Sequence, residues 1–260
     1  MRSLTRIVSL GVLLAAMVGC AAQEAAPVGS SGMAGTVGTG GTIGTGGAAG
    51  IDPTGTGGTG GTPSTATGPY QPLVMNATWT YLVNEPGLSY EKNNVVEALE
   101  DLGGIKAGTM AYRVREMLPT ETQLTWYQPS ETVVMRHREQ ALDTAGVMKS
   151  ESWFSPYRLR LDETTEHTAA GATWNATFTE NHTSRSKPAK QTTKTETWTV
   201  MAAEESVTVP AGTFNALRVS RTDQSDGSIK TFWFVRGIGK VKETTATGHT
   251  EELSRYNIPQ

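Results

Sequence analysis

The chain has 260 residues and a formal net charge of -3, and 37% of its residues are hydrophobic. Of its 29 glycines, 18 fall within residues 1–68, a stretch that contains no Phe, Trp or Tyr. The residues from 69 onward have an ordinary globular composition and suit one domain, or two small ones, at roughly 150 residues per domain. A charge near zero excludes the basic surface typical of nucleic-acid-binding domains, and a single cysteine excludes a disulfide framework and cysteine-based metal clusters.

The first 19 residues have the features of a bacterial signal peptide. Arg2 and Arg6 give the segment a positive start, and residues 7–18 are almost wholly apolar. This apolar stretch is shorter than the roughly 20 residues that a membrane-spanning helix requires. Small residues follow it, in the string Met17-Val18-Gly19-Cys20.

That string resembles the lipobox of bacterial lipoproteins, in which the cysteine becomes the first mature residue and carries acyl chains. The resemblance implies that residues 1–19 are removed, that Cys20 is the lipid attachment site and that acyl chains anchor the protein in a membrane. Two alternatives stay open: a secretory cleavage after Ala22, and Cys20 as merely a small apolar residue. Because Ala21 stands where Asp would retain a lipoprotein in the inner membrane, the resemblance implies the outer membrane of the cell envelope.

Residues 20–68 are predicted to form a disordered Gly/Thr-rich linker that begins with the lipidated cysteine. The pattern Gly-Thr-Gly-Gly-Thr recurs from Gly38 to Thr62, and such a composition cannot offset the entropy of its own ordering. Gly55, Gly57 and Gly60 satisfy the spacing of a dinucleotide-binding fingerprint. That motif works only between a strand and a helix, and neither is predicted here, so we expect no cofactor.

Residues 69–260 are predicted to form an all-β domain, a single antiparallel meander that makes a curved sheet or half-barrel. Trp79, Tyr81 and Val83 fall on one face of a strand, and apolar and polar residues alternate from 157 to 161 and from 173 to 179. Alternation of this kind is typical of half-buried strands. Turn-forming Pro, Gly, Asn and Asp residues separate the segments, as in a series of hairpins.

The segment 94–102 is ambiguous between helix and strand. Val95, Leu99 and Leu102 recur at helical spacing, and Gly103-Gly104 could end a helix. The alternative is a strand from Tyr90 to Leu102 that turns at the glycines into a second strand at 110–118. We favour the strand because the neighbouring segments are strands and a hairpin is the shorter connection.

Two strings in the C-terminal third are distinctive. Val-Pro-Ala-Gly-Thr-Phe at 209–214 ends one strand, turns and begins another. Trp-Phe-Val-Arg-Gly-Ile-Gly-Lys-Val-Lys at 233–242 starts within an apolar run that must be covered on both faces. With the aromatic opening at 76–81, these strings resemble a group of uncharacterised lipoproteins and secreted proteins of Gram-negative bacteria, myxobacteria especially. The resemblance spans about residues 70–258, and the group has no agreed activity to carry over.

A search for catalytic chemistry finds little. The four histidines are not arranged at metal-ligand spacing: His137, His167, His182 and His249. We expect His137 on a solvated strand edge and His249 in a turn. The chain has no Gly-x-Ser-x-Gly elbow, and its one cysteine belongs to the anchor. We therefore expect no catalytic residue, no metal site and no enzyme.

Three hypotheses for function follow. The favoured one is a non-enzymatic envelope lipoprotein whose β domain binds a protein or polysaccharide partner or serves as a structural module. The second is a periplasmic carrier or chaperone that holds a lipid or other apolar ligand in a curved sheet. The third is an enzyme with unrecognised residues. Eight aromatic residues are expected mainly in the core, with the cavity of a carrier as the alternative: Trp79, Tyr81, Trp174, Phe178, Trp198, Phe232, Trp233 and Phe234.

The anchor prediction can be tested by metabolic labelling with a palmitate analogue. We expect the full chain to incorporate the label and the Cys20→Ala variant to lose it, because thioether lipidation requires the thiol. Equal labelling of the two proteins would contradict lipidation at Cys20.

Overall fold

The computed structural model describes residues 67–259, so the predicted signal peptide, Cys20 and most of the linker lie outside the described residues. The described chain is built almost entirely of strands, and none of its helices is long and apolar enough to cross a membrane. The strands are β1 (Thr78–Glu85), β2 (Leu88–Asp101), β3 (Met110–Met117), β4 (Glu121–Pro129), β5 (Val133–Asp143), β6 (Met148–Asp162), β7 (Thr173–Ser184), β8 (Lys187–Val209), β9 (Gly212–Asp223), β10 (Ile229–Val235), β11 (Gly239–Thr245) and β12 (Thr250–Asn257).

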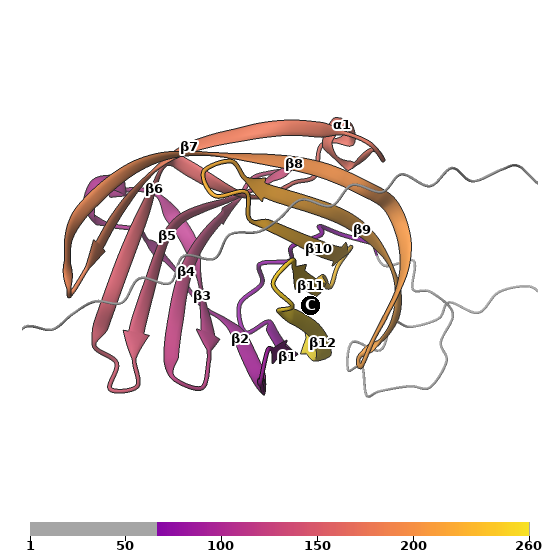
Figure 1. Cartoon of the computed structure of the whole chain (residues 1–260), viewed down its shortest axis with the longest axis horizontal. Coiled ribbons are helices and arrows are strands. Elements are labelled where there is room, and N and C mark those ends of the chain that lie inside the picture. Colours follow the sequence, from indigo (N-terminus) through magenta and orange to yellow (C-terminus); the bar gives the residue numbers. More distant parts are fainter. Residues whose placement is uncertain (1–66, 260) are drawn as a thin grey trace, which may run out of the picture. The chain divides into compact units, whose positions relative to one another are not determined.

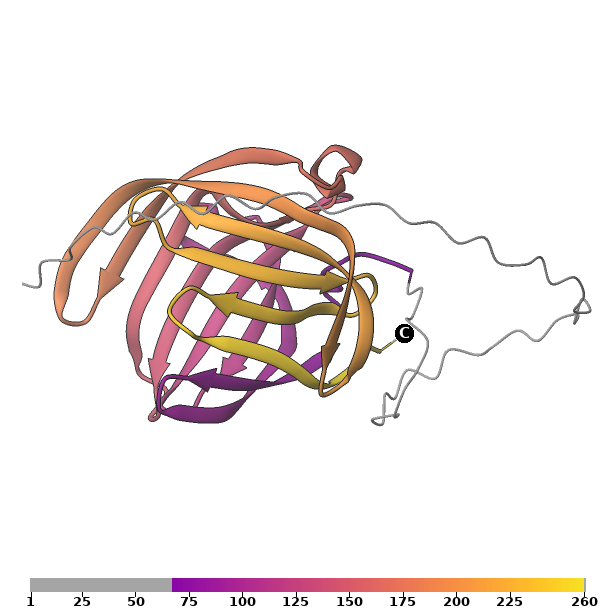
Figure 2. The same ribbon diagram turned by 45° about the vertical axis from the view of Figure 1, so that its right-hand side comes forward.

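The strands form an antiparallel meander, which confirms the predicted fold class (Figure 1). Each strand pairs with the next along the chain, and β1 also pairs with β12 from Thr78↔Asn257 to Asn84↔Thr250. The sheet is therefore a closed barrel and not the half-barrel expected, since the last strand returns to the first. Figure 2 shows the yellow C-terminal strands beside the indigo β1–β2 hairpin. Closure leaves no unpaired edge at this junction.

Strand β2 settles the ambiguous segment 94–102 in favour of the strand. It runs from Leu88 to Asp101 and pairs with β1 on one side and β3 on the other. Residues 102–109 connect it to β3 and include a short 3-10 helix, η1 (Gly104–Lys106). The glycines Gly103 and Gly104 both have positive φ, 64° and 52°, so the chain turns where the sequence predicted.

The long β8–β9 hairpin bends over the outside of β10–β12, as Figure 1 shows. Its tip contacts β12, where the Ala211 N–H donates a hydrogen bond to the Leu253 carbonyl over 2.9 Å. Beneath the hairpin lies Trp233, whose Nε1 donates to Glu205 over 3.0 Å. Phe232 and Phe234 on the same strand are also buried. The apolar run in β10 is thus covered on both faces, as its sequence required.

Apolar side chains pack together toward one end of the barrel. The segment 68–77 crosses this end, where the Gly237 N–H donates to the Pro69 carbonyl. Trp79 and Tyr81 point inward from β1 and donate hydrogen bonds to the carbonyls of Ile238 and Lys240. Next to these two side chains the interior of the barrel contains a cavity, and the side chains that line this cavity form the candidate site.

Candidate functional site

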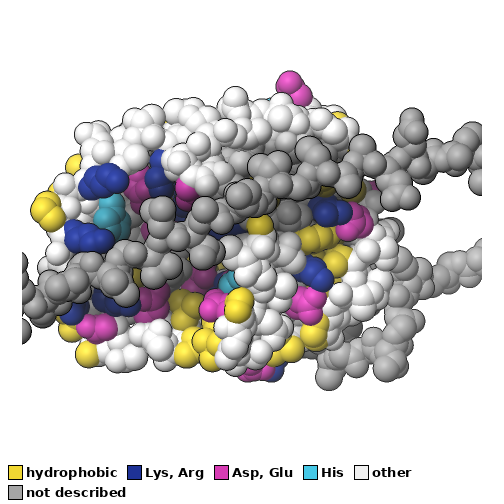
Figure 3. Space-filling view, in the orientation of Figure 1, with side chains coloured by type: hydrophobic (Ala, Val, Ile, Leu, Met, Phe, Trp, Pro, Cys, Tyr) yellow, Lys and Arg dark blue, Asp and Glu magenta, His cyan; other side chains and the backbone are white. Residues whose placement is uncertain are grey.

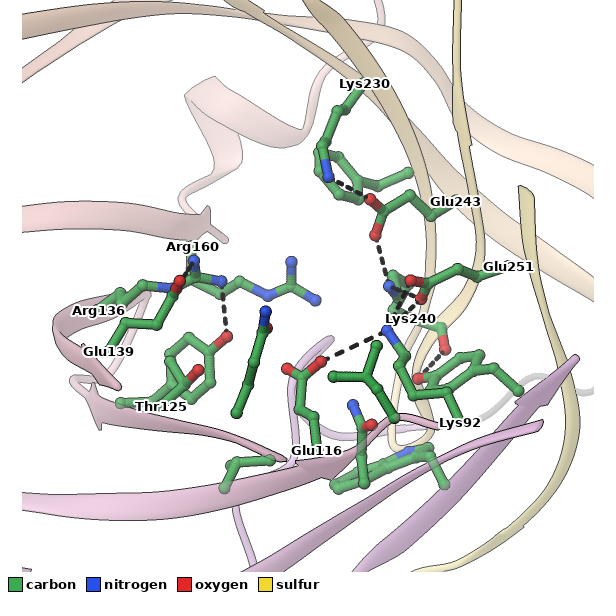
Figure 4. A pocket seen from close by; sticks show the side chains of 18 of the residues that line it. Lys92, Glu116, Thr125, Arg136, Glu139, Arg160, Lys230, Lys240, Glu243 and Glu251 are labelled. Carbon is green, nitrogen blue, oxygen red and sulfur yellow. Dashed lines mark hydrogen bonds and ion pairs between the residues drawn. The ribbon is translucent and has the colours of Figure 1, made fainter. Parts of the chain in front are cut away.

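The barrel encloses a cavity of about 430 Å³, within the range of about 300–1,000 Å³ typical of small-molecule sites. Its wall is unusually charged: seven Lys or Arg side chains and five Glu side chains line it. Glu85 and His249, next to the β1–β2 and β11–β12 turns, lie at one end of the lining. Figure 4 shows Arg136 and Arg160 on one side of the cavity, with Lys230, Lys240, Glu243 and Glu251 on the other.

Two β-bulges each bring a pair of charged residues onto the inner face of the barrel. In a regular strand the two members of each pair would point to opposite faces. Residues i and i+3 of a regular strand point to opposite faces, whereas one bulged residue between them restores a common face. In β11 the ladder skips Val241, so Lys240 and Glu243 both point inward. In β5 the ladder with β4 skips His137, which does the same for Arg136 and Glu139.

On one side of the cavity, three lysines and three glutamates form what we call the lysine–glutamate cluster: Lys92, Lys230, Lys240, Glu116, Glu243 and Glu251. Glu251 lies between two ammonium groups, with Nζ of Lys92 and Nζ of Lys240 each 2.6 Å from its carboxylate. Lys240 also contacts Glu243 over 2.5 Å. Because Glu243 and Glu251 are direct cross-strand neighbours, their repulsion would destabilise the sheet without the lysines.

The electrostatics of this cluster follow from burial and pairing. Burial alone would raise the pKa of the Glu251 carboxyl, but the charges of Lys240 and Lys92 hold that pKa well below its ordinary value. Burial would likewise lower the pKa of Lys240, and the carboxylates of Glu243 and Glu251 raise it instead. Three positive and three negative groups therefore balance one another inside the barrel.

Glu243, His249 and Glu251 also meet a geometric requirement for a metal site, since one ligand atom from each lies within 4.8 Å of the others. The lysines already occupy these carboxylates, however. Both oxygens of Glu243 contact lysine Nζ atoms, as do both oxygens of Glu251. A divalent cation would have to enter beside three ammonium groups, so we assign this group to the ion-pair network.

Four arginines of β5, β6 and β9 also line the cavity, and we call them the arginine cluster: Arg136, Arg158, Arg160 and Arg221. Arg158 donates through Nε and Nη2 to Glu196 Oε1, over 3.0 and 2.6 Å. Nε of Arg221 approaches the same oxygen to 3.4 Å. Glu196 on β8 is fully buried and is not part of the cavity wall, so it holds both guanidinium groups from behind.

The histidines lie apart from one another, and His249 is the one that reaches the cavity wall. It sits in the β11–β12 turn as predicted, and Glu251 and Glu85 raise its pKa by hydrogen bonding, Glu251 most strongly. The expectation for His137 is wrong. That residue is buried, not solvated, because it is the bulged residue of β5 and is covered by Lys106, whose Nζ lies 2.6 Å from its Nδ1. Burial, reinforced by Lys106, lowers the pKa of His137 to about 4.

The aromatic residues divide between the two roles considered for them. Phe178, Trp198 and Phe234 are core residues, whereas Trp79, Tyr81 and Phe232 are buried and also line the cavity. The predicted site residue Cys20 lies outside the described residues. The sequence analysis missed both charged clusters. The pairs Arg136/Glu139 and Lys240/Glu243 were a weak indication of them, because their opposite charges are three residues apart and share a strand face only when a bulge lies between them.

Comparison with known proteins adds little. No protein-family model matches the chain, and no curated protein matches it. One solved structure is similar, described as "a putative lipoprotein from Parabacteroides distasonis ATCC 8503", at 9% sequence identity and a TM-score of 0.38, covering 74% of this chain and 100% of that one. A likeness at this TM-score carries no argument about fold or function.

The buried cluster predicts a large difference between two adjacent glutamates on β12. Glu251→Gln should lower the free energy of unfolding by about 3–5 kcal/mol, because it leaves Lys92 and Lys240 buried without their shared partner. Glu252→Gln removes only the partly exposed pair with Lys242 and should lower it by about 1 kcal/mol or less. Urea denaturation at pH 7 measures both.

The same variants carry a pH test. The folded-state pKa of Glu251 is depressed, so its contribution is present above the ordinary value of 4.5 and is lost as the pH falls through the folded-state pKa. The gap between wild type and Glu251→Gln should therefore shrink in acid. Equal losses for the two variants at pH 7 would contradict the buried network.

Proposed function

We propose that this protein is a lipid-anchored protein of the bacterial envelope whose barrel is a non-enzymatic binding module for a polar small molecule. The anchor is supported by the lipobox resemblance at Cys20, and the outer membrane by Ala21 after it. The observation that carries the binding role is the cavity of about 430 Å³ inside the barrel. A purely structural module would fill this space with side chains, since protein interiors are normally close-packed.

The character of the cavity wall selects the kind of ligand. A carrier of acyl chains needs an apolar lining, because burying a methylene against charged groups gains little and leaves those groups without hydrogen-bond partners. Here 12 of the 24 lining residues are Lys, Arg or Glu. A polar, water-soluble ligand can replace the water around such groups with directed hydrogen bonds. The proposal therefore favours a polar occupant over the lipid or apolar ligand considered from the sequence.

Lys, Arg, Asp and Glu side chains intermingle on the face seen in Figure 3. Mixed charge of this kind is ordinary for a soluble surface and provides no steering toward nucleic acid.

Thiol labelling tests the proposal. Cys20 is the single cysteine of the chain, so the Cys20→Ala variant contains no thiol and only an introduced cysteine can react. Gln123 lines the cavity from β4, and Thr122 is its neighbour along the strand on the opposite face. In that background we expect Gln123→Cys to react with two hydrophilic methanethiosulfonates, one anionic and one cationic, at rates within about tenfold of Thr122→Cys. Mass spectrometry of the full chain in non-ionic detergent measures both rates.

Two results would contradict the proposal, each pointing to one of its rivals. An inert thiol at position 123, with position 122 reactive, would indicate a closed structural module. Saturable fluorescence enhancement of the apolar probe N-phenyl-1-naphthylamine that is removed by palmitate would indicate a lipid carrier. We expect no such enhancement.

A further inference from the structure

The arginine cluster contains more positive charge than its neighbours neutralise. Its four guanidinium groups contact two carboxylates, Glu139 through Arg136 and Glu196 through Arg158 and Arg221, which leaves an excess of two positive charges (4 − 2). The lysine–glutamate cluster holds three positive and three negative groups, so adding it to the count leaves the excess unchanged, although Glu243 acts on Arg221 and Glu116 on Arg136. An uncompensated buried charge is strongly destabilising.

The cross-strand register makes this arrangement more costly still. Arg136 on β5 lies directly opposite Arg158 on β6, and Arg221 on β9 lies directly opposite Lys230 on β10. Like charges at directly opposite positions of an antiparallel pair destabilise it. A sequence selected for stability alone would avoid both pairs, so the positive charge here is evidence of a function.

Arg160 has the fewest partners for its charge and its N–H groups. Within residues 67–259 it forms no ion pair, and its Nη2 donates one long hydrogen bond of 3.4 Å to Gln71. Its Nε is buried without an acceptor. Its side chain lines the cavity, as does that of Arg158 two residues before it. The guanidinium groups of Arg160 and Arg221 both lie over the ring of Phe232, 5.6 and 5.3 Å from its centroid.

Arg221 lies among positive charges that its neighbours compensate only in part. Burial, followed by the positive charge of Arg158, lowers the pKa of its guanidinium to about 10, so it stays protonated at neutral pH in a positive potential. Its carboxylate contact in the described chain is the 3.4 Å approach to Glu196 that it shares with Arg158. An anion in the cavity would relieve this potential and accept the remaining N–H groups.

We propose that the arginine cluster binds a doubly charged oxyanion, a phosphate or sulfate group, as part of the polar ligand; this inference rests on the proposed function and specifies its ligand class. Guanidinium groups match the oxygen geometry of such anions in bidentate fashion. A phosphate monoester carries about two negative charges at neutral pH, the excess that the cluster offers. The cavity size restricts the ligand to a small molecule.

Isothermal titration calorimetry of the full chain in non-ionic detergent, at constant ionic strength and in chloride buffer, tests the proposal with sodium phosphate, sodium sulfate and glucose 6-phosphate. We expect saturable binding of one anion per chain. Arg160→Gln and Arg221→Gln should weaken it at least tenfold. Arg255→Gln is the matched control, because Arg255 is an exposed arginine paired with Glu91 on the outside of the barrel, and it should bind as wild type does. Tighter binding of glucose 6-phosphate than of inorganic phosphate would identify an organic phosphoester as the ligand, and the reverse would identify the free ion.

A thermal melt without added anion separates lost binding from lost folding. Arg160→Gln removes one excess positive charge, so it should melt at or above the wild-type temperature while binding more weakly. The proposal is overturned if no oxyanion binds saturably up to about 10 mM, or if Arg255→Gln weakens binding as much as Arg160→Gln does. In either case, a reactive thiol at position 123 would leave the polar-ligand function standing, whereas an inert one would remove both.

Discussion

Charge burial within a closed sheet is the constraint on which this structure depends. Once β1 pairs with β12, the sheet shields every inward side chain from the surrounding solvent. Such a side chain is surrounded mainly by the inward side chains of the other strands. A charge placed there needs a partner at hydrogen-bond distance, since the desolvation of an ion costs several kcal/mol. Lys240 meets this demand with Glu243 and Glu251, and the three groups fix the positions of β11 and β12 on the inner face.

The two charged clusters differ in how far their buried charges are paired. In the lysine–glutamate cluster every lysine has a carboxylate partner. In the arginine cluster there are fewer carboxylates than guanidinium groups, and the Nε of Arg160 has no hydrogen-bond acceptor. In our proposal, stability and function are divided between the two clusters: the lysine–glutamate cluster is complete by itself, and the arginine cluster is completed by a ligand.

The sequence predicted the β meander and the covered apolar strand because both depend on local patterns, the alternation of side chains and the run at 231–235. It did not predict closure, which depends on pairing between residues far apart in the chain, such as Trp79 and Tyr256, separated by 177 positions (256 − 79). The charged site was missed for a related reason. Lys240 and Glu243 look like opposite faces of a strand until the bulge at Val241 is known, and Glu196 looks like a solvated residue in a Thr-rich strand although it is fully buried.

The central claim is that the unbalanced arginines form a binding site, and anomalous diffraction tests it most directly. Crystals of the protein soaked in sodium selenate, an analogue of sulfate, would be measured at the selenium edge. The account predicts an anomalous peak inside the barrel, within hydrogen-bond distance of Arg160 and Arg221, and no such peak in crystals of Arg160→Gln. Selenate bound only on the outer surface, with the interior empty beside the four arginines, would contradict it.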